Sequence, residues 1–357
     1  MKKILPSCED YITAIDVPRL IKATELNGGK VVCSNGNPVM YAGGFCVVFP
    51  FILSSSKKVA VRCWTAYVPD ADKRSDKIAS ELKRCGLPYF VEFDYIHQGI
   101  ATSNGVFPIV IMDWVNAVPL KDYINQHISD SNHIFNLAEH FKAMVSDLHK
   151  VSFSHGDLQH GNIMVTIDGK IILVDYDSMF VPGLENVSDE IKGLAGYQHP
   201  GRTNLKRLSP KADYFSELII YTSLVAFAKY PQLWQQLNVF KTETLLFTQE
   251  DLDCPNRSAI FKDLKKDRDL GPLLATIERA LKEQSIENLL PLEDAIIPES
   301  TRIVGGLQNK WKKRLLFTKE EYQIDHERLS KKWKLIKKQS CKNVKIDVTS
   351  ITSKWKK

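Results

Sequence analysis

The sequence predicts an α+β fold in which a small β-rich part precedes a larger, mainly helical part. Residues 38–115 consist mostly of runs of β-branched and aromatic residues, which are typical of strands. From Leu120 onward, apolar residues recur at helical spacing instead. Apolar residues make up 44% of the 357 residues and charged residues 25%, so we expect a soluble globular protein with a sizeable core.

These shifts divide the chain into four predicted regions. Residues 1–37 form a polar N-terminal extension with one short helix near Leu20. Residues 38–115 form the β-rich part, and residues 116–300 form the helical part, which begins with the connector Asn116-Ala117-Val118-Pro119. Residues 301–357 form a basic tail that we expect to be helical or partly disordered.

Within the β-rich part, strands are expected in four runs: Val39–Phe51, Lys58–Trp64, Tyr89–Tyr95 and Phe107–Trp114. Between the second and the third run, residues 72–85 should form a helix, because Ile78 and Leu82 lie four positions apart.

The helical part contains two strong helix patterns and one irregular segment. Phe135–Val151 carries apolar residues at helical spacing, and Ala212–Lys229 is apolar along most of its length. The segment Ser178–Arg202 is rich in Gly and Pro, which predicts irregular structure.

The most informative stretch lies between these two helices. His155-Gly156-Asp157-Leu158-Gln159-His160-Gly161-Asn162 places an Asp and an Asn five positions apart, and Asp175 ends the second of two apolar runs that follow. The turn Ile167-Asp168-Gly169-Lys170 between these runs predicts a β-hairpin, which would bring Asn162 and Asp175 to one edge, with Asp157 facing the same space. The alternative is an ordinary surface loop followed by a hairpin.

Phosphoryl transfer from ATP needs such a set of side chains. One carboxylate orients and deprotonates a hydroxyl, while an amide and a second carboxylate hold metal ions. With these motifs the chain resembles the protein-kinase-like superfamily over about residues 38–290. Residues 155–162 are similar to the kinase catalytic loop, and Asp175-Tyr176-Asp177 stands where kinases have Asp-Phe-Gly.

The resemblance implies a bilobal protein-kinase-like fold, with a small β-rich N-lobe and a larger, mainly helical C-lobe. It points to a divergent Ser/Thr kinase of bacterial type that uses ATP and Mg²⁺. Asp157 is then the catalytic base, and Asn162 and Asp175 are the metal ligands.

Three positions depart from the kinase pattern. Gly156 replaces the Arg that receives an activation-loop phosphate, so activity should not need such a phosphate. Gln159 stands where a Lys is usual, and it can hydrogen-bond the γ-phosphate without neutralising it. Asp177 occupies the glycine position of the metal motif, where it either caps the following turn or adds a metal ligand.

The resemblance also implies nucleotide-binding residues in the β-rich part. Residues 41–48 look like a degenerate phosphate-covering loop with Gly43, Gly44 and Phe45 at its tip, although a plain hairpin turn gives the same pattern. Arg62 falls at the position of the phosphate-binding Lys, and a strand residue with a solvated head is the alternative. Glu81 is the best candidate for the helix carboxylate that braces Arg62, although Asp76 lies on the same helix and a solvated helix face is the alternative for Glu81.

Phe107–Val115 resembles the strand that enters the kinase hinge. Met112 would lie beside the adenine, and Asp113 to Val115 would offer it backbone groups. Farther along, Tyr197-Gln198-His199-Pro200 resembles the end of an activation segment. Asp213 matches the structural Asp that ties the following helix to the catalytic loop, a position that also suits an ordinary helix start.

Cysteine usage and terminal sequence predict a cytoplasmic protein. The seven cysteines are scattered and contain no Cys-x-x-Cys pair, which favours a reducing compartment over disulfides or zinc. The basic start at Lys2 and Lys3 meets Glu9 and Asp10 before a signal-peptide core can form. No apolar run is long enough to be a transmembrane segment.

The basic tail carries most of the charge asymmetry. Residues 305–357 hold 16 Lys and Arg against 5 Asp and Glu, a formal charge of +11. Trp311, Trp333 and Trp355 lie among the lysines, a pattern that suits an acidic partner, nucleic acid or a membrane surface. We favour a solvated, partly helical tail that packs on the helical part over such a contact.

The favoured hypothesis is ATP-dependent phosphoryl transfer to a protein hydroxyl by a Ser/Thr kinase, including autophosphorylation. A second hypothesis is a small-molecule phosphotransferase of the aminoglycoside or choline kinase kind, whose loops also contain His-Gly-Asp. A third is a nucleotide-binding pseudokinase scaffold, which the Arg62 substitution and the eroded glycine loop motivate.

Overall fold

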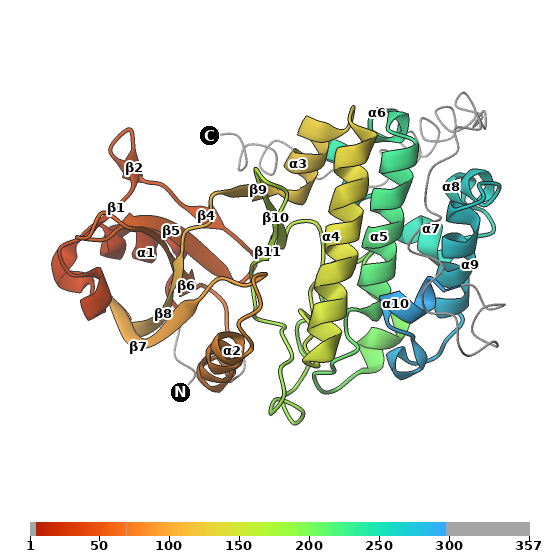
Figure 1. Cartoon of the computed structure of the whole chain (residues 1–357). Helices are drawn as coiled ribbons and strands as arrows, with labels where there is room; N and C mark the ends of the chain where they lie inside the picture. Colours follow the sequence, from red (N-terminus) through yellow and green to blue (C-terminus); the bar gives the residue numbers. More distant parts are fainter. Residues whose placement is uncertain (1–4, 69, 298–357) are drawn as a thin grey trace, which may run out of the picture.

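The structure is a computed structural model that describes residues 5–68 and 70–297. It confirms the α+β fold, because most strands gather at one end of the described chain and most helices at the other (Figure 1). The two largest apolar clusters follow the same division, one on the sheet and one among the helices. Among the described helices, none has both the length and the apolar character needed to cross a membrane.

The larger sheet has six strands, and every pairing in it is antiparallel. Its strands are β1 Lys30–Val31, β4 Tyr41–Ala42, β5 Cys46–Ile52, β6 Lys58–Trp64, β7 Phe93–Thr102 and β8 Gly105–Asp113. The order is β1-β5-β6-β8-β7, with β4 also paired to β5. A separate hairpin joins β2 Cys33–Ser34 to β3 Asn37–Pro38. The run predicted over residues 39–51 is therefore two strands and a turn, whereas β6 has its predicted bounds.

The register between β5 and β6 determines which side chains share a face of this sheet. Cys46 lies opposite Trp64, and Val48 lies opposite Arg62, so these four residues project to one face. Alternate residues such as Phe49 project to the other face, where they are fully buried in an apolar cluster.

The N-terminal segment covers that apolar face and differs from the predicted extension. Its α-helix, α1, is Cys8–Ile15, whereas residues near position 20 form only the short 3₁₀ helices η1 Pro18–Leu20 and η2 Thr24–Leu26. The α-helix begins at Cys8 because a capping box stabilises its first turn. The Ser7 side chain accepts the N–H of Asp10, and the Asp10 carboxylate accepts the N–H of Ser7.

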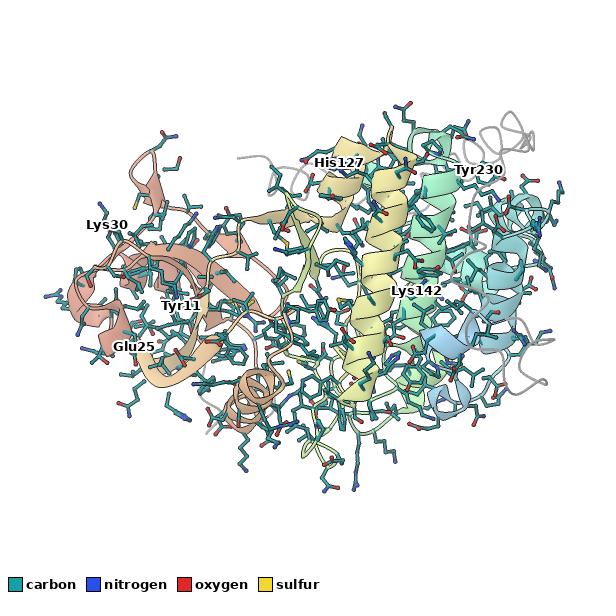
Figure 2. All side chains as sticks on the ribbon, viewed as in Figure 1. Tyr11, Glu25, Lys30, His127, Lys142 and Tyr230 are labelled. Carbon is teal, nitrogen blue, oxygen red and sulfur yellow. The ribbon has the colours of Figure 1, made fainter. Side chains whose placement is uncertain are left out.

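Tyr11 of α1 anchors this segment to the sheet. Its side chain is fully buried between α1 and the strands (Figure 2), and its hydroxyl donates to the carbonyl oxygen of Trp64 at 3.0 Å. The segment is therefore part of the core of the β-rich part.

Helix α2, Ala71–Cys85, and the segment before strand β7 also contact the helical part. Helix α2 directs Ile78 and Leu82 into the apolar cluster of the helical part. The strand predicted from Tyr89 begins only at Phe93, because the Tyr89 carbonyl accepts the N–H of Leu173 at 2.7 Å. Residues 89–91 thus pair with the other sheet.

The helical part is built on α4 Ser131–Lys150 and α5 Tyr214–Lys229, which pack against each other. Every residue of α5 from Phe215 to Ala228 is buried, so this helix forms the centre of the cluster. The remaining elements are α3 Leu120–His127, α6 Gln232–Gln236, α7 Gln249–Asp253, α8 Ala259–Leu264, α9 Leu270–Ala280, α10 Leu292–Ala295, η3 Pro200–Asn204, η4 Val239–Lys241 and η5 Ile286–Asn288.

A three-stranded sheet completes this part, in the order β11-β10-β9. The predicted hairpin is confirmed, with β10 at Ile163–Thr166 and β11 at Ile171–Leu173. The connector predicted at Asn116–Pro119 instead contains strand β9, Ala117–Pro119, because it pairs with β10.

Candidate active site

The β10–β11 hairpin places Asn162 and Asp175 at the same edge, as predicted. Ile163 lies opposite Leu173, and the N–H of Val174 donates to the carbonyl oxygen of Asn162 at 3.0 Å. Asp175 follows Val174 directly in the chain, so it comes immediately after this last hydrogen bond of the hairpin.

Asp157 lies beside Asn162 and is held by two donors. Asn162 Nδ2 donates to the Asp157 carbonyl oxygen at 2.8 Å and to Oδ2 at 3.0 Å, and the N–H of Leu194 donates to Oδ1 at 3.0 Å. Burial raises the pKa of Asp157, and this effect outweighs the lowering by His155 and by the Leu194 N–H. A carboxylate that is fixed in place and has a raised pKa suits a general base.

Asp213 fixes the backbone of the predicted catalytic loop from the start of α5. Its carboxylate is buried and accepts the N–H groups of His155 and Gly156, the latter at 3.0 Å. The ring of His155 donates from Nε2 to the carbonyl oxygen of Val174 at 2.9 Å, which joins the loop to the end of β11. The link from Asp213 to the catalytic loop that the sequence indicated is therefore present.

Gly156 is required by the backbone at this point. Its φ is +78°, and a Cβ atom added to it would lie 2.0 Å from the carbonyl oxygen of Ser178. No side chain fits here without moving the backbone, so the missing Arg of the kinase pattern has a steric cause in this chain.

Arg62 of β6 forms ion pairs with two carboxylates of the site. Its Nη1 and Nη2 atoms donate to the two carboxylate oxygens of Asp177 at 2.7 and 2.5 Å. Nη2 also donates to Asp175 Oδ1 at 3.0 Å, and Nε donates to the sulfur of Cys46 at 3.0 Å. Arg62 is 7% exposed, so this is a buried ion pair rather than a solvated strand residue.

Glu81 does not brace Arg62, contrary to the expectation from sequence. Its carboxylate accepts from Lys77 and from Arg84, each at 2.7 Å and both on the same helix. The physical reason is that Asp177 already occupies the guanidinium of Arg62 with both oxygens. Helix α2 reaches the motif through Arg74 instead, whose Nη2 donates to the carbonyl oxygen of Asp177.

Asp175 adopts a backbone conformation that is uncommon for its residue type. Its φ is +68°, in the left-handed region. Such conformations cost free energy and are concentrated at functional sites. The side chain is 45% exposed, which leaves it accessible although one oxygen contacts Arg62.

Gly43, Gly44 and Phe45 form the turn between β4 and β5. The N–H of Gly43 donates to the carbonyl oxygen of Cys46 at 2.8 Å, and a Cβ atom on Gly44 would meet no described atom within 4 Å. Phe45 is 40% exposed at the tip. The turn is thus open enough for a ligand to approach its backbone, and Cys46 links it to Arg62.

The predicted hinge residues lie at the end of β8: Met112 and Asp113 are its last two residues, and Val115 comes after it. Met112 is half-buried and packs against both the helical cluster and the cluster around Trp64. Asp113 forms an exposed salt bridge of 2.6 Å with Lys57, and Val115 is half-buried. The side chains of Met112 and Asp113 therefore have structural partners.

Gln159 contacts its own loop. Its Oε1 accepts the N–H of Gly161 at 2.6 Å, which makes a local turn. The neighbouring His160 bonds through Nδ1 to the hydroxyl of Tyr197 at 2.8 Å, and burial lowers the pKa of His160 to about 3. His160 is thus neutral and fixes the loop to the segment that ends at Pro200.

The side-chain oxygen atoms available at this edge fit a magnesium ion that also binds phosphate. Asn162 uses Nδ2 for its bonds to Asp157, which leaves Oδ1 for a metal, and Asp175 keeps one carboxylate oxygen beyond the one on Arg62. Mg²⁺ in nucleotide sites takes one or two protein oxygens, with phosphate and water supplying the rest. No group of three His, Cys, Asp or Glu residues forms a metal site in the described parts of the chain.

Sequence reasoning missed the residues that enclose Asp157. Gly193 has a φ of +77°, and a Cβ atom on it would lie 2.6 Å from Asp157 Oδ1. Before it, Asp189 is buried against Arg202, which donates from Nε and Nη2 at 2.9 and 3.0 Å. The Gly and Pro content of this segment was visible, but the pairing of Asp189 with Arg202 leaves no signal in sequence spacing.

Comparison with known families supports a kinase-like assignment. Residues 96–182 match the ABC1 atypical kinase-like domain, a range that contains Asp157, Asn162 and Asp175 but neither Arg62 nor Asp213. A comparison with curated proteins finds no match. The family match supports the protein-kinase-like superfamily, and the mixed α+β architecture with its sheet fits a kinase-like fold.

Proposed function

We propose that this protein is an ATP- and Mg²⁺-dependent phosphotransferase that acts on a protein hydroxyl, as a Ser/Thr kinase capable of autophosphorylation. The observation that carries the proposal is the hydrogen-bonded set of Asp157, Asn162 and the Asp175 edge. Its backbone is fixed by Asp213, and the family match covers the same residues.

Each residue has a role in this proposal. Asp157 orients the substrate hydroxyl and accepts its proton, and its raised pKa suits that task. Asn162 Oδ1 and Asp175 hold magnesium, which neutralises charge on the transferred phosphoryl group when bound. Gln159 turns toward Gly161 and keeps its amide NH₂ group for the γ-phosphate.

The nucleotide lies, in this proposal, between the sheet and the β10–β11 hairpin. The backbone of Gly43, Gly44 and Phe45 covers the phosphates, and Met112 to Val115 contact the base. In this proposal the N-lobe consists of residues 38–115 together with the packed N-terminal segment that contains α1, and the C-lobe begins at residue 116. The two largest apolar clusters support this bilobal division.

Partners and location belong to the same proposal. The substrate is a protein, and the cytoplasm is the location, which the free cysteines at the described positions favour. The basic segment 305–357 lies outside the described residues, and we propose that it contacts an acidic partner, nucleic acid or a membrane surface.

Transfer of labelled phosphate from ATP tests the proposal. The wild-type chain should incorporate phosphate in the presence of Mg²⁺, and Asp157→Asn should lower the rate by about 10² to 10⁴ while nucleotide binding remains. Asp175→Asn should weaken Mg²⁺-dependent nucleotide binding as well. Asp168→Asn is the matched control, because Asp168 is an exposed carboxylate in the turn of the same hairpin. Equal incorporation by wild type, Asp157→Asn and Asp175→Asn would refute the proposal.

One observation favours a second candidate, a nucleotide-binding pseudokinase. Four of the five N–H groups of Arg62 are used within the protein, which leaves one for a phosphate. Mg²⁺–ATP binding by calorimetry together with transfer to peptides and to hydroxylated metabolites separates the possibilities. Binding without transfer identifies a pseudokinase, and transfer only to metabolites identifies a small-molecule kinase.

A further inference from the structure

The contacts of Arg62 are distributed unequally between two carboxylates. Asp177 takes a bidentate pair of hydrogen bonds, at 2.7 and 2.5 Å, whereas Asp175 takes one at 3.0 Å. The side chain of Asp177 is 13% exposed and that of Asp175 is 45% exposed. Asp177 is therefore the main partner of Arg62, and Asp175 remains open to solvent on its other side.

Asp177 also joins Arg62 to helix α2. The carbonyl oxygen of Asp177 accepts from Nη2 of Arg74, a residue of α2 that is 3% exposed. Arg74, Asp177 and Arg62 thus form one continuous buried connection from α2 through the metal motif to β6. Glu81 of the same helix takes no part in it, because both of its carboxylate oxygens pair with Lys77 and Arg84.

We propose that Asp177 is the positioning residue of this site. Its carboxylate braces the Arg62 guanidinium, a role that the sequence suggested for Glu81 of α2. The inference rests on the proposed phosphotransfer function. Asp177 carries the negative charge two residues after the metal ligand Asp175, and α2 supplies a cation, Arg74, in place of a carboxylate. Arg62 therefore pairs with a carboxylate of the metal motif and not with Glu81, and α2 contacts the motif through Arg74 and the backbone carbonyl oxygen of Asp177.

This arrangement fixes three parts of the site together. One guanidinium binds Asp175 and Asp177, so the side-chain orientation of the metal ligand depends on Arg62, and that of Arg62 depends on Asp177. The sulfur of Cys46 accepts from Nε, so the glycine turn is connected to the same group. Loss of the Asp177 carboxylate should therefore disturb metal and phosphate positioning without touching the base.

The experiment compares Asp177→Asn and Arg74→Gln with Glu81→Gln as the matched control. Each full-length variant is assayed for phosphate transfer, for the Mg²⁺ dependence of the rate, and for binding of a non-hydrolysable ATP analogue. We expect Asp177→Asn to lower kcat at least about tenfold and to raise the Mg²⁺ concentration needed for half-maximal rate. Arg74→Gln should have a smaller effect of the same kind, and Glu81→Gln should stay within about twofold of wild type.

Unfolding measurements provide a readout that does not depend on activity. Asp177→Asn, Arg62→Gln and the double variant form a double-mutant cycle, in which the two single effects should not add because the residues are in contact. Additive effects in this cycle would overturn the link, as would a larger loss of kcat in Glu81→Gln than in Asp177→Asn. A wild-type chain that binds nucleotide but transfers no phosphate would refute the proposed function alone, since the cycle and the analogue binding still test the position of Arg62.

Discussion

The backbone carbonyl of Ser178 leaves no room for a side chain at Gly156. Replacing it with Ala should lower the free energy of unfolding by roughly 1–3 kcal/mol, because its Cβ would meet the carbonyl oxygen of Ser178 and its φ is +78°. Denaturant unfolding of the two proteins measures the difference.

The matched control is Gly44→Ala, at a glycine outside the left-handed region whose added Cβ would meet no described atom within 4 Å. It should change the free energy of unfolding by no more than about 0.5 kcal/mol. A Gly156→Ala protein as stable as Gly44→Ala would show that the loop backbone adjusts freely.

Under the proposed function, Asp157 as general base gives phosphate transfer a pH dependence whose sign can be stated. A general base works only when deprotonated, and burial raises the pKa of this carboxyl. The rate should therefore fall on the acid side at a higher pH than for an unperturbed Asp. The pH profile of kcat/KM measures this limb, and a profile that stays flat down to the ordinary pKa of Asp, about 4, would contradict the assignment.

Single residues also show where sequence reasoning stops. The order and spacing of Asp157, Asn162 and Asp175 are local, and the structure places these residues as the hairpin predicted. The partner of Arg62 is decided by which carboxylate reaches it across 115 positions of chain. The position of Glu81 on its helix made it a candidate partner of Arg62, and nothing in the sequence could exclude that pairing.

Among the elements, α4, α5 and α10 are joined by a buried ionic cluster. His149 of α4 bonds to Glu217 of α5 at 2.9 Å and to Glu293 of α10 at 2.9 Å. Burial alone would lower the pKa of His149, but these two carboxylates raise it from 6.5 to about 9. Burial raises the pKa of Glu217 to about 7, so both members of the pair are charged between about pH 7 and pH 9.

This cluster predicts a loss of stability at alkaline pH. The folded pKa of His149 is raised, so its contribution is complete below the unfolded value of 6.5 and is lost as pH rises through about 9. Between pH 7 and 9.5 the free energy of unfolding should fall by on the order of 2 kcal/mol. Urea unfolding across this range measures it, and His149→Gln should flatten the slope.

The control for this slope is His133→Gln, on the exposed first turn of the same helix. It should leave the pH dependence of wild type nearly unchanged. If both variants kept the wild-type slope, the cluster would not be its source.

Helix α1 should be essential for the β-rich part. Tyr11→Ala should cost about 3–5 kcal/mol, since it empties a fully buried aromatic site, and Tyr11→Phe should cost about 1 kcal/mol for the lost bond to Trp64. Thermal unfolding of both variants gives the comparison. Equal stability of Tyr11→Ala and wild type would mean that α1 is dispensable.

Elements were predicted well where the signal is local and less well where pairing is distant. Strand β6 and helices α2, α4 and α5 follow from composition and periodicity. The start of β7 and the strand β9 do not, because contacts with β11 and β10 in the other part of the chain decide them.

At the scale of the whole molecule, the segment over the site is held by internal charges. Asp189 pairs with Arg202, and Lys192 also reaches Asp189 at 3.2 Å. Under the proposed function, this internal pairing takes the place of an activation-segment phosphate. Activity after exhaustive phosphatase treatment should therefore stay within about twofold of the untreated protein.

Mass spectrometry confirms that the phosphate has been removed, and a mock-treated sample serves as control. A large loss of activity on treatment would show that a phosphate, rather than Asp189, orders this segment.

The guanidinium of Arg62 has a consequence for the chemical reactivity of the site. Reagents that acylate amines react with the side chain of a lysine, which can lose its proton. A guanidinium that is always protonated and paired with two carboxylates is a poor nucleophile for such a reagent. An amine-acylating reagent should therefore leave Arg62 unmodified with or without bound nucleotide, and mass spectrometry of the treated chain would show this.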